Sequence, residues 1–195
     1  MQIEMESNGI NNMVDVVVEK YNPIWEEQFK LLYDRIWPSI FDVALSLEHV
    51  GSTSVPGLSA KPIIDLTIIT LDKDKLEIII QRLADIGIEH RGDLGIEGRE
   101  AFARLKDYPE HNLYACVNGS QALRNHLAVR YALRESSSLV QEYGKLKMEL
   151  ARKFSNDIDS YVEGKTDFIL NILKDKGFEL SDLENIKDVN KKQRI

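Results

Sequence analysis

An acidic residue inside an apolar strand is the sequence feature that most constrains this fold. The run from Ile63 to Thr70 is almost continuously apolar and is interrupted by Asp65 and Thr67, as expected of a strand covered on both faces. A carboxylate buried without partners costs several kcal/mol, so a cation or hydrogen-bond donors must compensate it. We therefore expect a buried sheet in which Asp65 faces such groups.

The segments around this strand predict a mixed sheet flanked by helices. Val43 to Val50 alternates with period two, and Arg99 to Leu105 and Leu113 to Val117 are further strand candidates. The other expected elements are a β-rich lead-in at Val14 to Tyr21, a helix opened by Asn22 and Pro23, a helix around Leu76 to Leu83, and helices at Ser120 to Arg134, Ser136 to Phe154 and Asp157 to Lys176. The predicted fold class is α/β (α+β), with a helical C-terminal part.

The organisation along the chain points to one domain over residues 14–178. No internal repeat and no shift in composition divides this stretch, whereas residues 1–13 and 179–195 are polar and are expected to fray. The first residues lack the basic and then apolar pattern of a signal peptide, and no apolar run approaches the length of a membrane span. We expect a cytoplasmic protein without a membrane partner, and the oligomeric state stays open.

The charge balance disfavours a long nucleic acid as partner. Lys and Arg number 25 and Asp and Glu number 32, which gives a net charge of −7. The segment from Gln121 to Lys153 is nevertheless basic, so a small anionic ligand fits better than a long polyanion, unless these are ordinary solvated helix faces. The single cysteine, Cys116, excludes an internal disulfide, and no Cys/His cluster has the spacing of a zinc site.

The loop that follows the first strand has the residue types of a phosphate-binding turn. Gly51, Ser52, Thr53 and Ser54 combine a glycine with three hydroxyl residues, so that backbone N–H groups and side-chain donors can approach an anion closely. A plain polar turn has the same composition. Asp65, a short way downstream, favours the functional interpretation.

Two lysines in the C-terminal helices lie on apolar stripes. Lys147 follows Tyr143 by four residues and Lys165 follows Tyr161 by four, which puts each pair on one side of its helix. Either lysine could simply pack its stem and extend its ammonium to water. Two such pairs together favour an anion-binding cleft.

The helix before them carries one histidine and two arginines of interest. His126 shares a stripe with apolar residues and is compatible with core packing as well as with a ligand site. Arg124 and Arg130 could contact phosphate groups, since a guanidinium matches phosphate geometry.

The chain resembles the GrpB family (UPF0157 type) of the nucleotidyltransferase superfamily. The resemblance rests on the run from His49 to Asp65, on Asn112-Leu113-Tyr114, on Tyr143 with Leu146-Lys147, and on Tyr161 to Ile169. It implies a nucleotidyltransferase fold in which Gly51 and Ser52 bind nucleotide phosphates and Asp65 is a carboxylate that holds Mg²⁺. It also makes Arg99, Arg104 and His111 cleft candidates. The family often has an acidic residue after the second arginine, where this chain has Tyr131.

The sequence departs from the superfamily at the second metal position. Residues two apart on a strand share a face, so the partner of Asp65 is Thr67, which cannot supply the charge of a second carboxylate. Magnesium-dependent nucleotidyl transfer is one hypothesis, and a non-catalytic nucleotide sensor or a protein-interaction module are the alternatives. The candidate site residues are Asp65 for catalysis and metal; Gly51, Ser52, Thr53, Ser54, Lys61, Arg124, His126, Arg130, Lys147 and Lys165 for phosphate or nucleotide; and His49, Thr67, Arg99, Arg104, His111, Tyr114, Tyr143 and Tyr161 as further cleft residues.

Overall fold

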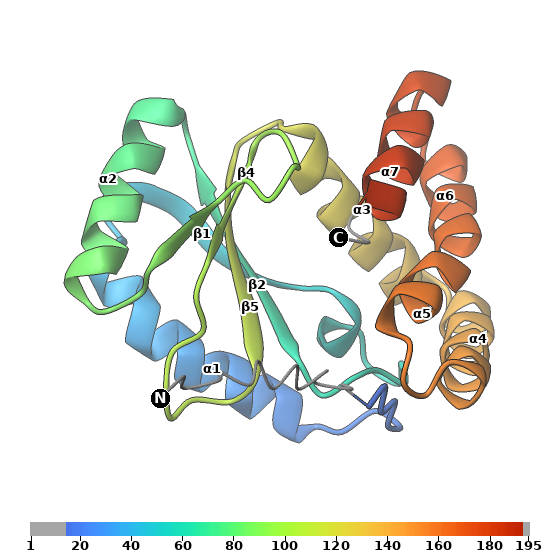
Figure 1. Cartoon of the computed structure of the whole chain (residues 1–195). Coiled ribbons are helices and arrows are strands. Elements are labelled where there is room, and N and C mark those ends of the chain that lie inside the picture. The colour runs from blue at the N-terminus through green and yellow to red at the C-terminus, as the bar shows by residue number, and fades with distance from the viewer. Residues whose placement is uncertain (1–14, 193–195) are drawn as a thin grey trace, which may run out of the picture.

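The computed structural model describes residues 15–192, and it places one mixed sheet between two groups of helices (Figure 1). The strands are β1 (Ala44–Val50), β2 (Ile64–Thr70), β3 (His90–Gly92), β4 (Arg99–Phe102) and β5 (His111–Val117). The helices are α1 (Ile24–Ile36), α2 (Lys73–Asp85), α3 (Gln121–Glu135), α4 (Ser137–Lys153), α5 (Ile158–Gly164), α6 (Thr166–Asp175) and α7 (Leu180–Lys192), with two short 3-10 turns at Trp37–Ser39 and Ser52–Ser54. The predicted mixed sheet flanked by helices is confirmed.

The strand order places the acidic strand between two neighbours. The order is β1-β2-β5-β4-β3, and β2 pairs antiparallel with β1 and parallel with β5. The register sets Asp65 beside Val50 on one side and Asn112 on the other, and it sets Thr67 beside Tyr114. Side chains that alternate along a strand share a face, so Asp65 and Thr67 of β2 face the same side as Asn112 and Tyr114 of β5.

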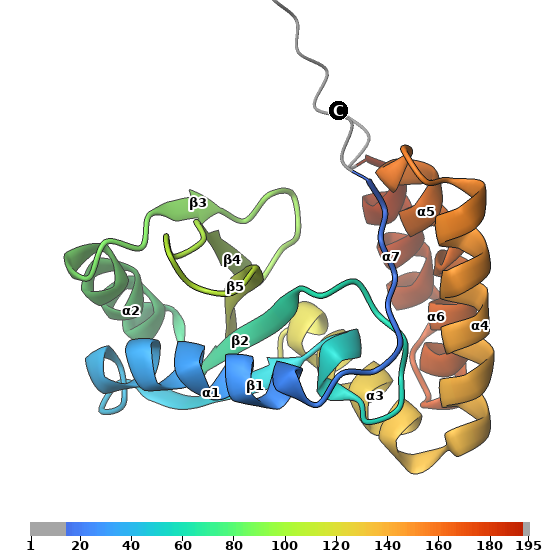
Figure 2. The same ribbon diagram turned by 90° about the horizontal axis from the view of Figure 1, so that it is seen from below.

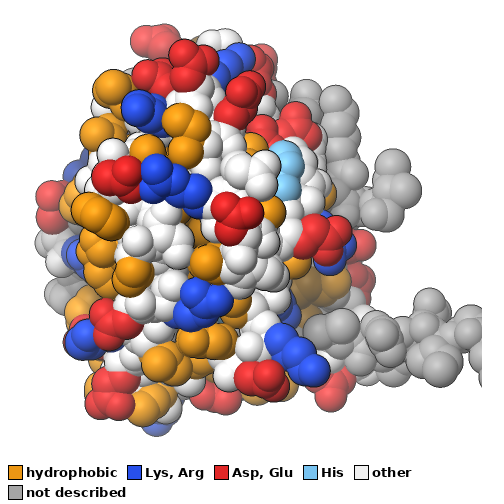
Figure 3. Space-filling view, turned by 90° about the vertical axis from the view of Figure 1, so that its left-hand side faces the viewer, with side chains coloured by type: hydrophobic (Ala, Val, Ile, Leu, Met, Phe, Trp, Pro, Cys, Tyr) orange, Lys and Arg blue, Asp and Glu red, His pale blue; other side chains and the backbone are white. Residues whose placement is uncertain are grey.

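The opposite face of the sheet carries the main hydrophobic core. Leu66 and Ile68 of β2 and Leu113 of β5 are fully or almost fully buried there, against the apolar faces of α1 and α2. Trp25 and Leu32 bring α1 to this face. The helix begins at Ile24, one residue after the expected start at Pro23, and Asn22 Oδ1 accepts a hydrogen bond from the Ile24 N–H. The surface beyond α2 mixes acidic, basic and apolar side chains (Figure 3).

The C-terminal helices form a separate layer beside the site face of the sheet. Figure 2 shows α4 to α7 standing as a bundle at one end of the sheet, with α3 leading from β5 into it. Val55 and Leu58 of the loop after β1 pack with Leu133 of α3 and Tyr143 of α4, which ties the loop to the bundle. The loop therefore lies between the sheet and the helices.

Two expected elements differ in the structure. The helix expected at Asp157 to Lys176 is divided into α5 and α6, because the Lys165 N–H donates to the Val162 carbonyl in a tight turn. Gly164 lies at this turn, where a Cβ would come within 2.5 Å of Leu150. The strand-like lead-in from Val14 contributes only an isolated bridge between Glu19 and Ala60, and Val14 itself lies outside the described residues.

Two further differences concern polar segments. Strand β3 was not expected, because its three residues are too short and too polar for the alternation signal. The stretch after residue 179 forms α7 over Leu180–Lys192 where fraying was expected, and Leu183 is its buried contact. The other predicted frayed end, residues 1–13, lies outside the described chain. Within residues 15–192, no helix is both long and apolar enough to cross a bilayer.

The position of the core predicts a specific stability difference between two leucines. Leu66→Ala should lower the free energy of unfolding by about 3 kcal/mol, because it opens a cavity in a central strand. Leu31→Ala on the exposed side of α1, where the leucine is 52% exposed, should change it by less than about 0.5 kcal/mol. Urea unfolding of both variants tests this, and equal losses would contradict the assigned core.

Candidate functional site

The turn after β1 lies directly against the Asp65 carboxylate. Gly51 has a φ of +69°, and a Cβ at this position would come within 2.1 Å of Asp65 Oδ2. Only glycine therefore accommodates both the backbone conformation and the close approach. The glycine of the predicted phosphate loop and the predicted metal carboxylate are in fact neighbours, as the register between Val50 and Asp65 requires.

Two of the three hydroxyl side chains in the loop form hydrogen bonds within the protein, and the third is left for a ligand. Thr53 Oγ1 donates to the Ile63 carbonyl at 3.2 Å, and Ser54 Oγ donates to the Gly51 carbonyl at 2.7 Å. Both side chains are buried and hold the loop in shape. Ser52 is partly exposed, and its hydroxyl makes no hydrogen bond to any part of the chain that the structure describes. Ser52 is therefore the side-chain donor of this loop that a ligand can use.

Asp65 is held by an amide and not by a second carboxylate. Asn112 Nδ2 donates to Asp65 Oδ1 at 2.8 Å, and Arg104 Nη2 donates to Asn112 Oδ1 at 3.3 Å. Arg104 also forms an ion pair with Glu110 and donates to the His111 carbonyl, so its guanidinium is fixed. Burial raises the pKa of Asp65, whereas the hydrogen bond from Asn112 and the charges of nearby lysines act against that rise.

Three lysines surround this carboxylate without pairing closely with any acid. Lys147 is only 1% exposed, and its Nζ lies 4.5 Å from the centre of the Tyr143 ring with no hydrogen-bond partner in the described chain. Lys165 Nζ lies 4.4 Å and Lys61 Nζ 5.9 Å from the centre of the Tyr161 ring. The two Tyr-to-Lys pairs predicted from helical spacing thus reach one site.

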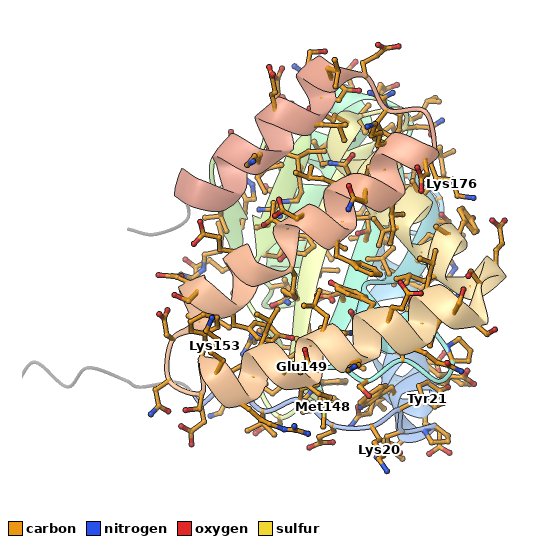
Figure 4. All side chains as sticks on the ribbon, turned by 90° about the vertical axis from the view of Figure 1, so that its right-hand side faces the viewer. Lys20, Tyr21, Met148, Glu149, Lys153 and Lys176 are labelled. Carbon is orange, nitrogen blue, oxygen red and sulfur yellow. The ribbon has the colours of Figure 1, made fainter. Side chains whose placement is uncertain are left out.

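Other charged residues of α4 are exposed on the side of the helix that faces away from the site. Glu149 and Lys153 lie on the outer surface of the bundle in Figure 4. Lys147 lies on the inner side and is buried, while its helix neighbour Lys145 is 79% exposed. Simple snorkelling, in which the ammonium reaches water, therefore does not describe Lys147.

The electrostatics of the three lysines reflect burial and crowding. Burial lowers the pKa of Lys165 to about 8, and the charge of Lys61 adds to this effect. Burial also lowers the pKa of Lys147 well below its usual range, with Lys165 as a second cause, and it lowers the pKa of Lys61. Asp65 opposes each of these shifts but does not cancel them. A bound anion would favour the charged form of all three lysines.

The donor set does not fit the magnesium that the superfamily implies. One carboxylate, Asp65, is present, and the positions beside it carry the Asn112 amide and the Thr67 hydroxyl. The amide points its Nδ2 toward Asp65, and the surrounding ammonium groups repel a divalent cation. Over residues 15–192, no group of three His, Cys, Asp or Glu side chains could hold a metal ion.

A second row of polar residues follows Asp65 along the sheet. Thr67 Oγ1 lies 3.3 Å from His126 Nδ1, and the His126 ring lies 6.0 Å from that of Tyr114. Burial lowers the pKa of His126 to about 4, and the charge of Arg99 adds to this, so the imidazole is neutral. Arg99 lies over the Tyr114 ring at 4.4 Å. These four predicted residues contact one another on the same side of the sheet as Asp65.

Four of the predicted site residues serve the fold elsewhere. Arg130 is buried and donates to Glu48 and to the His49 carbonyl, and Arg124 pairs with Asp182 of α7 at 3.3 Å. His49 stacks on an aromatic ring of α1 and lies 3.0 Å from Thr53 Oγ1. Burial lowers the pKa of His49 to about 4. His111 is fully buried and bonded through both ring nitrogens to the loop that precedes β5.

Sequence reasoning missed the importance of Asn112. It stands in register with Asp65 and donates to it, whereas sequence analysis named it only within the motif that carries the family resemblance and gave it no role in the site. Only the pairing of β2 with β5 identifies that role, and helical or strand periodicity cannot supply that pairing.

Comparisons with known proteins identify the family of this chain. The family model described as "GrpB protein" matches residues 15–175. UPF0157 protein YqkA of Bacillus subtilis is 30% identical over 76% of this chain, although the match spans only 43% of YqkA. Glutamate-rich protein GrpB of Alkalihalophilus pseudofirmus is 28% identical over 84% of this chain and 97% of the relative.

Solved structures place the fold in the same group. The crystal structure of conserved protein GrpB from Enterococcus faecalis has a TM-score of 0.71 and 32% identity, and the match covers 88% of this chain and 98% of that one. The Cid1 poly(U) polymerase gives a TM-score of 0.45 at 15% identity over 66% of this chain, which is too low to assign an activity. Because the family model covers most of its length, this chain belongs to the GrpB family.

Proposed function

We propose that this protein binds a phosphorylated small molecule, such as a nucleotide, between the Gly51–Ser54 loop and the lysines of the C-terminal helices. The observation that carries the proposal is the buried ammonium of Lys147, which has no hydrogen-bond partner in the described chain. Lys61 and Lys165 share the site, and Ser52 offers a free hydroxyl. Burial favours the neutral amine of Lys147, and an anionic ligand would supply the negative charge that favours its ammonium form.

The same residues favour binding over nucleotidyl transfer. Transfer of this kind uses two metal ions about 4 Å apart, held by carboxylates on one side of the sheet. Thr67 and Asn112 occupy the positions beside Asp65 on that face and carry no charge. A nucleotide-binding protein or sensor is therefore the preferred hypothesis, and we derive no transfer step at this site.

The protein-interaction alternative has less support in the geometry. It required the basic segment from Gln121 to Lys153 to present its charges to an acidic partner. Arg130 and Lys147 of that segment are buried, Arg134 donates twice to the Ser54 carbonyl, and Arg124 pairs with Asp182. Part of this charge is thus buried or paired within the molecule, whereas the basic side chains of Arg124, Arg134, Lys145, Arg152 and Lys153 are exposed.

Replacing the buried lysine tests the proposal. Lys147→Met should weaken the binding of adenosine 5′-monophosphate at least about tenfold, because a hydrogen bond to a charged group contributes about 1.5–3 kcal/mol. Its Tm without ligand should stay the same or rise, since an unpaired buried ammonium is removed. Isothermal titration calorimetry and thermal unfolding measure the two effects.

The matched control lies on the same helix. Lys145→Met removes an ammonium that is 79% exposed, so it should leave both affinity and Tm unchanged. A wild-type protein that binds no phosphorylated probe, or an equal loss of affinity in both variants, would contradict the proposal.

The lowered pKa of Lys165 predicts opposite pH trends for binding and stability. Above pH 8 the folded protein loses this proton while the unfolded chain keeps it up to about pH 10.5. This lysine therefore makes the free energy of unfolding rise with pH in that window, whereas the affinity for adenosine 5′-monophosphate falls. Titrations at pH 7.0, 8.5 and 9.5 measure the fall in affinity, and urea unfolding measures the stability.

A conservative variant isolates Lys165 as the cause. Lys165→Arg remains charged through this range and should show a smaller fall in affinity with pH than the wild type. If the arginine variant shows the same decline as the wild type, the pH dependence does not come from Lys165.

A further inference from the structure

Arg99 is a second buried cation on the site face, and no acid neutralises it. The side chain is only 7% exposed, and its Nε is buried without a hydrogen-bond partner. No carboxylate in residues 15–192 forms an ion pair with it, and its neighbour Glu100 points to the other face of the sheet, where it binds His90 at 2.6 Å. The phosphate site proposed above does not account for this guanidinium.

The fold holds Arg99 firmly in place. It begins β4 and pairs with Cys116 of β5, and its guanidinium lies over the Tyr114 ring. The preceding Gly98 has a φ of +76°, and a Cβ there would come within 2.9 Å of Ser120, which begins α3. The strand pairing, the ring contact and this tight turn together position a charge that the fold itself does not use.

The guanidinium and the lysines lie on either side of Tyr114. On this face of β5, Tyr114 stands between Asn112, which pairs with Asp65, and Cys116, which pairs with Arg99. The paired residues Thr67 and Tyr114 lie two positions further along their strands than the pair Asp65 and Asn112. This spacing corresponds to about 7 Å. The site face therefore presents two cationic ends separated by neutral polar and aromatic groups.

We propose that the phosphorylated ligand carries a second anionic group, a phosphoryl or carboxyl, which Arg99 binds while the lysines bind the first. This inference rests on the proposed function and names its ligand class as a molecule with two separated anions. A guanidinium presents parallel N–H donors that match two oxygens of either group. The neutral His126 and the Tyr114 ring would lie beside the part of the ligand that joins the two anions.

Two matched pairs of probes test the second anion. Adenosine 3′,5′-bisphosphate differs from adenosine 5′-monophosphate by one phosphoryl group, and 3-phosphoglycerate differs from glycerol 3-phosphate by one carboxyl group. For at least one pair, the wild type should bind the member with two anions about tenfold or more tightly than the other. The pair that shows the preference identifies the second group as phosphoryl or carboxyl.

The variant Arg99→Met should abolish this preference and leave the affinity for the member with one anion within about twofold. Without ligand its Tm should equal or exceed that of the wild type, because an uncompensated buried charge is removed. Arg91→Met, which removes an exposed arginine paired with Glu89, is the matched control and should change neither quantity.

Each remaining outcome overturns the inference in a distinguishable way. Wild-type binding of the single-anion probes without a preference in either pair refutes the second anion but leaves the phosphate site standing. A preference that survives in Arg99→Met refutes the role of this residue, and a lowered Tm with equal loss for all probes makes Arg99 structural. If the wild type binds none of the four probes, the proposed function and this inference fail together.

Discussion

The contact between Gly51 and the Asp65 carboxylate determines the geometry of the whole site. It requires a glycine in a left-handed conformation directly after β1, and the antiparallel register of β1 with β2 brings the two residues together. The parallel register of β2 with β5 then adds Asn112 to the other side of the carboxylate. Backbone hydrogen bonds fix these pairings, so they also fix the position of Gly51, where the loop begins, relative to Asp65. The lysines of α4 and α5–α6 can therefore face it at a defined position.

The charges on this face reverse the arrangement expected of a magnesium-dependent transferase. A metal centre holds carboxylates around cations, whereas here the amino groups of three lysines lie around one carboxylate. Asp65 lowers the cost of burying these cations, and Asn112 keeps the carboxylate oriented. Under the proposed function, an anionic ligand would complete the neutralisation of the lysines.

Sequence patterns predicted the strands and helix faces that depend only on the burial and spacing of neighbouring residues. The alternation before Gly51 and the apolar run around Asp65 are strands because burial on one or both faces leaves such patterns, and the four-residue spacing from Tyr143 to Lys147 sets both on one helix side. The division of the helix at Lys165 depends on how closely Gly164 packs on Leu150, which is a contact between separate helices. Arg130 was predicted to contact phosphate and instead pairs with Glu48, because helical phase gives a direction but not the group that lies there. The role of Asn112 needed the strand register for the same reason.

The most direct test of this account is the effect of Mg²⁺ and of Asp65 on ligand binding. Calorimetric titration of adenosine 5′-monophosphate into the wild type and into Asp65→Asn should be carried out with excess Mg²⁺ and with EDTA. We expect equal wild-type affinity in Mg²⁺ and EDTA, because the lysines and not a metal bind the phosphate. We also expect Asp65→Asn to retain binding that is the same in Mg²⁺ and in EDTA, because the lysines remain in place. Binding that requires Mg²⁺ and disappears in Asp65→Asn would contradict the account and restore Asp65 as a metal ligand.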